Sequence, residues 1–208
     1  MDQSVIDSIV RWPNVPAVAG WLSLSSRGEW RLHPNGDAEQ GGPGVGVSNT
    51  QILSFFGRNY SNEGDGRYFF ENGPQRVYVR LDAAPYVLRL MPENGTLLTH
   101  NNLVVKQVRR WLIDDLGNVY ADTDLGPGRI DDRDLFLLAD LLVDDLGLNL
   151  LDRVEAGGQD SPPGLSLGAP EKEQRFPALS KFAPLSWVPS QKISTEMKFI
   201  ANPGVPVK

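Results

Sequence analysis

The stretch FFENGPQRVYVRL, residues 69–81, decides the fold, because it predicts a β-hairpin in the middle of the chain. Two β-prone runs flank a short segment of turn-forming residues. A four-residue loop places Glu71 opposite Arg76 and Phe70 opposite Val77, whereas a two-residue Asn-Gly loop would put a proline, which has no N–H, into the ladder. We expect the first register, with Phe70 and Val77 on the core face. The other face then carries Arg67, Phe69, Tyr78 and Arg80.

More short strands surround this hairpin, with turn signals at a spacing of roughly 8–12 residues. The expected strands are Trp21–Leu24, Trp30–Leu32, Tyr86–Leu90, Thr96–Thr99, Val104–Ile113 and Val119–Asp122. Apolar periodicity predicts helices over residues 2–11, 48–57 and 130–147, the last capped by Asp131. We therefore expect a β-rich α+β fold: an antiparallel meander sheet or partly open barrel with a helix near each end.

The composition changes at residue 155, where prolines become frequent and regular periodicity is lost. This change predicts a globular domain over residues 1–154 and a Pro-rich C-terminal tail over residues 155–208, partly docked on the domain. Apolar side chains recur every three residues in the tail, which is the repeat of a polyproline II helix. We expect this edge to bind a protein partner through Phe176, Leu179, Phe182, Leu185 and Trp187.

Composition limits the classes of function. The formal net charge is −6, which argues against a general nucleic-acid or anionic-membrane binder, because such proteins need a positive field. The first residues lack the basic region and apolar core of a signal peptide, and aspartates interrupt the Leu-rich stretch 135–151. We expect no membrane span and a cytoplasmic location.

The chain has no cysteine and two histidines, which nearly excludes a multi-histidine or thiolate metal site. His33 and His100 both lie next to turns, and we expect them to be solvated. The aspartates between residues 114 and 134 suit turns and helix caps better than a calcium loop, because DTDLGPG lacks the closing glutamate. The glycine-rich residues 41–46 are not followed by Lys-Ser or Lys-Thr, and we expect a flexible loop. We expect no metal, no cofactor and no catalytic residue.

Aromatic and guanidinium groups gather around the hairpin and suggest a ligand surface. We select Arg58, Asn59, Tyr60, Arg76 and Tyr78 as candidate contacts for an anion and a ring. Acidic neighbours nearly cancel the arginines, so single-stranded nucleic acid on the outer sheet face is a weaker alternative. The simpler interpretation of that face is cross-strand contact under a helix or the tail.

Several stretches resemble an uncharacterised proteobacterial protein family of about 200 residues. The resemblance is carried by RWPNVPAVAGWLSLSSRGEWRL (residues 11–32), LSFFGRNYSNEGDGRYFFENGPQRVYV (residues 53–79) and IDDRDL (residues 130–135), and by two motifs near the end, WVP (187–189) and MKFI (197–200). It covers most of the chain in patches. It implies no activity, but it implies that the end of the chain folds back and docks.

The residues and the resemblance together favour a non-enzymatic cytoplasmic interaction or accessory module, and they leave enzymatic activity open. The first alternative is a small-ligand-binding protein or hydrolase that uses the Arg58–Tyr60 and Arg76–Tyr78 surface. The second is a single-stranded nucleic-acid binder on the outer face of the sheet.

Overall fold

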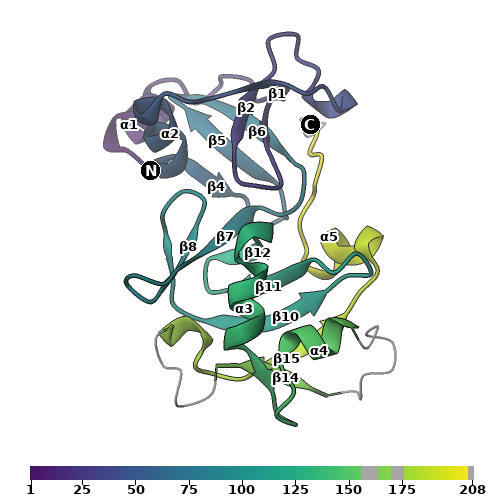
Figure 1. The fold of residues 1–208 in the computed structure, drawn as a ribbon. Helices are drawn as coiled ribbons and strands as arrows, with labels where there is room; N and C mark the ends of the chain where they lie inside the picture. Colours follow the sequence, from purple (N-terminus) through teal and green to yellow (C-terminus); the bar gives the residue numbers. More distant parts are fainter. Residues whose placement is uncertain (156–163, 170–175, 206–208) are drawn as a thin grey trace. The chain divides into compact units, whose positions relative to one another are not determined.

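The structure, a computed structural model, describes residues 1–155, 164–169 and 176–205. These residues form a β-rich α+β fold of 15 strands and five α-helices (Figure 1). The chain divides into two compact units: unit 1 comprises Met1–Pro85 and Lys198–Lys208, and unit 2 comprises Tyr86–Met197. Each unit contains one open sheet and its own core.

Unit 1 is built on a six-stranded sheet in the order β3-β2-β1-β6-β5-β4. Its elements are α1 (Gln3–Arg11), β1 (Val18–Leu24), β2 (Trp30–Leu32), η1 (Ala38–Gln40), β3 (Val45–Gly46), α2 (Thr50–Arg58), β4 (Tyr60–Asn62), β5 (Tyr68–Asn72) and β6 (Gln75–Leu81). The pairing of β1 with β6 is parallel, and the other pairings in this sheet are antiparallel.

Unit 2 is built on a nine-stranded sheet in the order β13-β14-β15-β10-β11-β12-β7-β8-β9. Its strands are β7 (Tyr86–Met91), β8 (Thr96–Thr99), β9 (Val104–Val105), β10 (Val108–Ile113), β11 (Val119–Thr123), β12 (Gly126–Ile130), β13 (Val143–Asp144), β14 (Ser166–Gly168) and β15 (Ala183–Trp187). Its helices are η2 (Asp132–Asp134), α3 (Leu135–Leu141), α4 (Leu150–Glu155), η4 (Pro177–Leu179), η5 (Ser190–Lys192) and α5 (Ile193–Glu196).

The β-rich α+β class is confirmed, but the sheets are mixed rather than wholly antiparallel. Parallel pairs join β1 to β6, β7 to β12 and β10 to β15. Each pair links strands that are far apart in sequence, as a parallel connection requires. A pattern of short strands and turns does not contain this information, because it describes neighbours along the chain only.

The central hairpin has the expected register. Phe70 lies opposite Val77 and Glu71 lies opposite Arg76, with Gly73 at a φ of +62° in the turn. Alternation along both strands sends Phe70 and Val77 to one face and the charged pair to the other. The hairpin therefore separates an apolar face of the unit 1 sheet from a charged one.

Four hairpin turns share one geometry. Ser25, Thr99, Asp114 and Asp144 begin these turns, and the backbone N–H of each donates to the carbonyl four residues later. A side-chain oxygen of the first residue also accepts from a backbone N–H within the turn. The fourth residue adopts a positive φ, and it is Gly28, Asn102, Gly117 and Gly147 respectively.

One of these turns ends a helix that we expected to continue to residue 147. That expectation is wrong, because α3 stops at Leu141 and β13 follows. The Asp144 carboxylate accepts from the N–H groups of Leu146 and Leu148, so a turn competes successfully with the last helical residues. Asp131 is a cap as predicted, since it accepts from the N–H of Arg133, but the helix that it begins is the 3₁₀ helix η2, which directly precedes α3.

Described residues after 155 make contacts in each of the two units. In unit 2, β15 pairs in parallel with β10, and the Trp111 indole donates to the carbonyl of Leu167 at 3.1 Å. In unit 1, residues 198–205, drawn in yellow in Figure 1, approach β6, where the N–H of Leu81 donates to the carbonyl of Ala201. The expectation that residues 1–154 form a globular domain without this segment stays a prediction.

No helix among the described residues combines the length and the apolar content that a membrane span requires. The helices that cover the sheets are short, and α1 and α2 have nine residues each.

Replacing Asp114 by alanine should destabilise the protein by about 2–4 kcal/mol. Its buried carboxylate accepts from the backbone N–H groups of Leu116 and Asn118 and from the Tyr120 hydroxyl, and the substitution leaves these donors unpaired. Urea denaturation measures the loss. The control is Asp140→Ala, at an exposed site on α3. Equal stability of the two variants would contradict this account of the turns.

Candidate functional site

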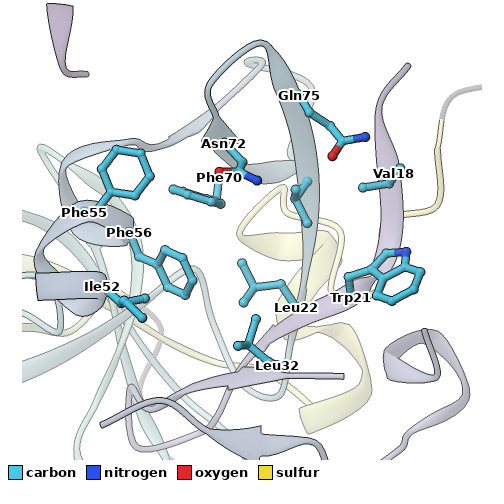
Figure 2. A pocket seen from close by; sticks show the side chains of 11 residues that line it. Val18, Trp21, Leu22, Leu32, Ile52, Phe55, Phe56, Phe70, Asn72 and Gln75 are labelled. Atoms are coloured by element: carbon cyan, nitrogen blue, oxygen red, sulfur yellow. The ribbon is translucent and has the colours of Figure 1, made fainter. Parts of the chain in front are cut away.

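An open pocket on the apolar face of the unit 1 sheet is the candidate site (Figure 2). Its volume is about 540 Å³, within the usual range of small-molecule sites. Strands β1, β2, β5 and β6 form its floor, and α2 forms one wall. It is lined by Val18, Trp21, Leu22, Leu32, Ile52, Phe55, Phe56, Phe70, Asn72, Gln75 and Val77.

Helix α2 forms this wall because its start and its apolar face are both well defined. The Asn49 side chain accepts from the N–H groups of Gln51 and Ile52, as expected of a capping residue. Phe55 and Phe56 then both pack against Phe70 of β5, with ring centroids 5.5 and 4.5 Å apart. These contacts are edge-on or tilted, which is the favourable geometry for aromatic pairs.

The opposite side of the pocket depends on a bulge in β1. Gly20 has a φ of +88°, and the register between β1 and β6 shifts between Val18 and Leu22. The bulge lets the consecutive residues Trp21 and Leu22 both line the pocket. A Cβ at Gly20 would lie 2.6 Å from the carbonyl oxygen of Gly36, so only glycine fits this position.

The pocket presents apolar surface to solvent. Trp21 is 47% exposed, Leu32 43% and Ile52 41%, while Leu22 beneath them is buried. Figure 2 shows Ile52, Phe55 and Phe56 on one side and Val18 and Trp21 on the other. Asn72 and Gln75 lie together at one end. No lining side chain is titratable, which suits binding of an apolar group rather than acid–base chemistry.

The five residues predicted to bind a ligand fall into separate clusters. Arg58 pairs with the Asp2 carboxylate through two hydrogen bonds of 2.9 and 3.0 Å, which lower the pKa of Asp2. Buried Asn59 accepts from the N–H of Asp2. These bonds hold the start of the chain beside the end of α2. The Tyr60 hydroxyl is buried elsewhere and donates to the carbonyl of Pro85.

Arg76 and Tyr78 lie on the other face of the sheet. Arg76 pairs with Glu71 and Glu63 and stacks over the Phe69 ring at 3.8 Å. Burial and a hydrogen bond to Glu63 raise the pKa of Tyr78, so its hydroxyl stays protonated at neutral pH. Two carboxylates already occupy the Arg76 guanidinium, so an anionic ligand would have to displace one of them.

A second pocket, of about 520 Å³, borders this charged cluster. Its lining includes Glu71, Arg76 and Tyr78 and the proline-containing segment 13–17. Phe69 and Tyr78 are only 4% and 2% exposed, so no base can stack on them in this conformation. The chain end approaches this face, because Val205 lines the same pocket as Arg76 and Tyr78.

The five residues predicted to bind a protein partner lie mostly inside unit 2. Phe176 is buried just before the 3₁₀ turn η4, Leu179 is buried at the end of that turn, and Leu185 is buried in β15. Phe182 is 45% exposed, and Trp187 is half-buried. The recurrence of apolar residues every three positions therefore does not correspond to one polyproline II helix, because the segment forms the 3₁₀ turn η4 and then the strand β15.

The expectation of solvated histidines is wrong. His33 is 1% exposed, and its Nε2 lies 2.8 Å from the Ser23 hydroxyl while its Nδ1 lies 3.1 Å from an Asp37 carboxylate oxygen. His100 packs on Tyr86, and burial lowers the pKa of its imidazole to about 3. Sequence spacing did not reveal either environment, because both depend on what covers the ring.

The hydroxyl of Ser23 contacts His33, and His33 contacts the carboxylate of Asp37. Serine hydrolases have the same sequence of serine, histidine and aspartate contacts in their catalytic triad. Ser23 is completely buried in β1 and faces away from the apolar pocket. A substrate carbonyl cannot reach its oxygen in this conformation. The three residues instead connect β1 and β2 to the loop that precedes β3.

That loop was expected to be flexible, but it is closely packed on the sheet. The Arg80 guanidinium donates to the carbonyls of Ala38 and Gly42. A Cβ at Gly44 would lie 2.7 Å from His33 Nε2, and the residue has a φ of +63°. Gly44 therefore allows the loop to approach the buried histidine closely.

Replacing Gly44 by alanine should destabilise the protein by about 1–3 kcal/mol more than the same change at Gly41. Both glycines have a positive φ, but a Cβ at Gly41 would meet no atom within 4 Å. The difference therefore isolates the clash with His33. Thermal unfolding of both variants measures it, and equal transition temperatures would show that the loop is not closely packed on His33.

The family model DUF2944, described as "Protein of unknown function (DUF2946)", matches residues 1–204. The chain therefore belongs to this family, which is consistent with the resemblance to an uncharacterised family. No curated protein matches the chain.

Two solved structures are similar. One is a DUF1285 family protein from Silicibacter pomeroyi DSS-3, with 16% sequence identity, a TM-score of 0.48 and 85% of each chain covered. The other is a DUF1285 family protein from Shewanella baltica OS155, with 16% identity and a TM-score of 0.40. It covers 57% of this chain and 90% of its own.

Proposed function

We propose that this member of the DUF2944 family is a non-enzymatic binding module that holds a small apolar ligand in the pocket of unit 1. The observation that carries the proposal is the lining: nine of its eleven side chains are apolar, the other two are amides, and none is charged. Such a surface gains free energy mainly by removing apolar area from water.

The exposure of the lining supports the same function. Trp21, Leu32 and Ile52 surround a concave surface and remain accessible in the described chain. Exposed apolar side chains that gather in one place mark binding sites more often than scattered ones do. Trp21 and Leu32 belong to the floor of four strands, and Ile52 belongs to the α2 wall. A cytoplasmic location, as expected from the sequence, is part of this proposal, and cell fractionation tests it.

Leu32→Gln should weaken binding of the neutral fluorescent probe N-phenyl-1-naphthylamine about fivefold, because the probe loses contact with an apolar side chain in the pocket. The control is Leu103→Gln in unit 2, since Leu103 is 41% exposed and Leu32 is 43% exposed. Fluorescence titration of the wild type and both variants gives the dissociation constants.

The control variant should bind the probe as the wild type does. Failure of the wild-type protein to bind the probe would contradict the proposed function. Equal weakening by both substitutions would contradict the location of the site.

A protein partner on the segment 176–187 is a second candidate, favoured by one observation. Phe182 exposes 45% of its surface, and its ring lies against Gly168, where an added Cβ would be 2.9 Å away. This position makes the ring an ordered apolar contact that is open to solvent. The buried members of the predicted edge would then hold the segment in place rather than meet the partner.

The second candidate predicts that immobilised Phe182→Ser protein captures less of a specific partner from a native lysate than the wild type does. The matched control is Leu116→Ser, at a turn residue of unit 2 that is 74% exposed. Identical capture by all three proteins would exclude Phe182 as a contact.

A further inference from the structure

We propose that the ligand of this pocket has an uncharged hydrogen-bonding group at one end of an apolar body, and that Asn72 and Gln75 recognise this group. The inference rests on the proposed function and adds the chemical class of the ligand. It depends on which side chains of the β5–β6 hairpin face the pocket and which face the opposite side of the sheet.

The strands that form the floor send their charges to the opposite face. In β6, Val77 lines the pocket, whereas its neighbour Arg76 pairs with Glu71 on the opposite face of the sheet. In β1, Leu22 lines the pocket, and its neighbour Ser23 contacts His33 on the other side. A carboxylate or ammonium in the pocket would lose hydration and find no opposite charge among the lining residues.

Two amides are the polar groups at the hairpin end of the lining, and the Trp21 indole N–H is a further donor on its other side. Asn72 and Gln75 are paired across the turn of the β5–β6 hairpin, and both reach the same end of the pocket (Figure 2). The Asn72 side chain is exposed and makes no hydrogen bond to any described residue. Gln75 donates to the carbonyl of Pro16 at 3.4 Å, a long bond that leaves its carbonyl oxygen able to accept.

An amide offers a donor and an acceptor without charge, so the pair suits a ligand group such as a carboxamide or an alcohol. The rest of the lining suits an apolar body. From the hairpin end, the pocket continues between the Phe55 and Phe56 side and the Trp21 side toward Leu32. A ligand with its polar group at Asn72 and Gln75 would therefore place its apolar part over Leu22 and Val77.

Displacement of N-phenyl-1-naphthylamine by compounds with one chain length and different head groups tests this inference. At pH 7, octanamide and 1-octanol should displace the probe at concentrations at least about tenfold below those needed for octanoate and protonated octylamine. In Asn72→Leu/Gln75→Leu, with displacement referred to the variant's own dissociation constant for the probe, this advantage of the neutral compounds should fall about fivefold. The control is Gln51→Leu, at an exposed amide of α2 outside the pocket lining.

The outcomes separate the two proposals. Preference for the neutral compounds, lost in the double variant and kept in the control, supports the inference. If the probe binds and Leu32→Gln weakens it, but octanoate competes as well as octanamide or the double variant keeps the preference, the inference is overturned and the proposed function stands. If the wild type does not bind the probe, both are overturned.

Discussion

The register of the β5–β6 hairpin is the constraint on which the rest of unit 1 depends. Pairing Glu71 with Arg76 puts both charges on one face, and alternation then puts Phe70 and Val77 on the other. A shift by one residue would exchange the faces. The charged face would then meet α2, and the apolar face would meet residues 13–17 and Val205, which line the second pocket together with Arg76 and Tyr78. Both the pocket and the ion-pair cluster thus result from one choice of register.

Polar side chains in this protein mainly hold turns and termini in place. The four turns that begin at Ser25, Thr99, Asp114 and Asp144 each use a side-chain oxygen to satisfy backbone N–H groups. Asp2 similarly connects the start of the chain to Arg58. Asp114 and Asp144, two of the many aspartates in the second half of the chain, thus have a structural role in turns.

The two proposals depend on a division between charge and apolar surface. Arginines on the charged face already have carboxylate partners, which makes them poor anchors for a further anion. The apolar pocket has no such internal partners, and its exposed rim includes Trp21. A neutral ligand matches that surface because it loses little hydration on entry and can still bond to the amides at the hairpin end.

Local patterns were sufficient for the features that involve neighbours in sequence. The hairpin register, the cap at Asp131 and the turns that carry glycine all follow from short-range chemistry, and the sequence by itself determined them. Contacts between distant segments were decided by the tertiary structure: the parallel pairs, the burial of His33 and the integration of β15 into the unit 2 sheet. The pocket belongs to this second group. Its lining comes from β1, β2, α2 and the hairpin, and whether an apolar side chain such as Leu32 ends in a core or at an open surface depends on what the fold places above it.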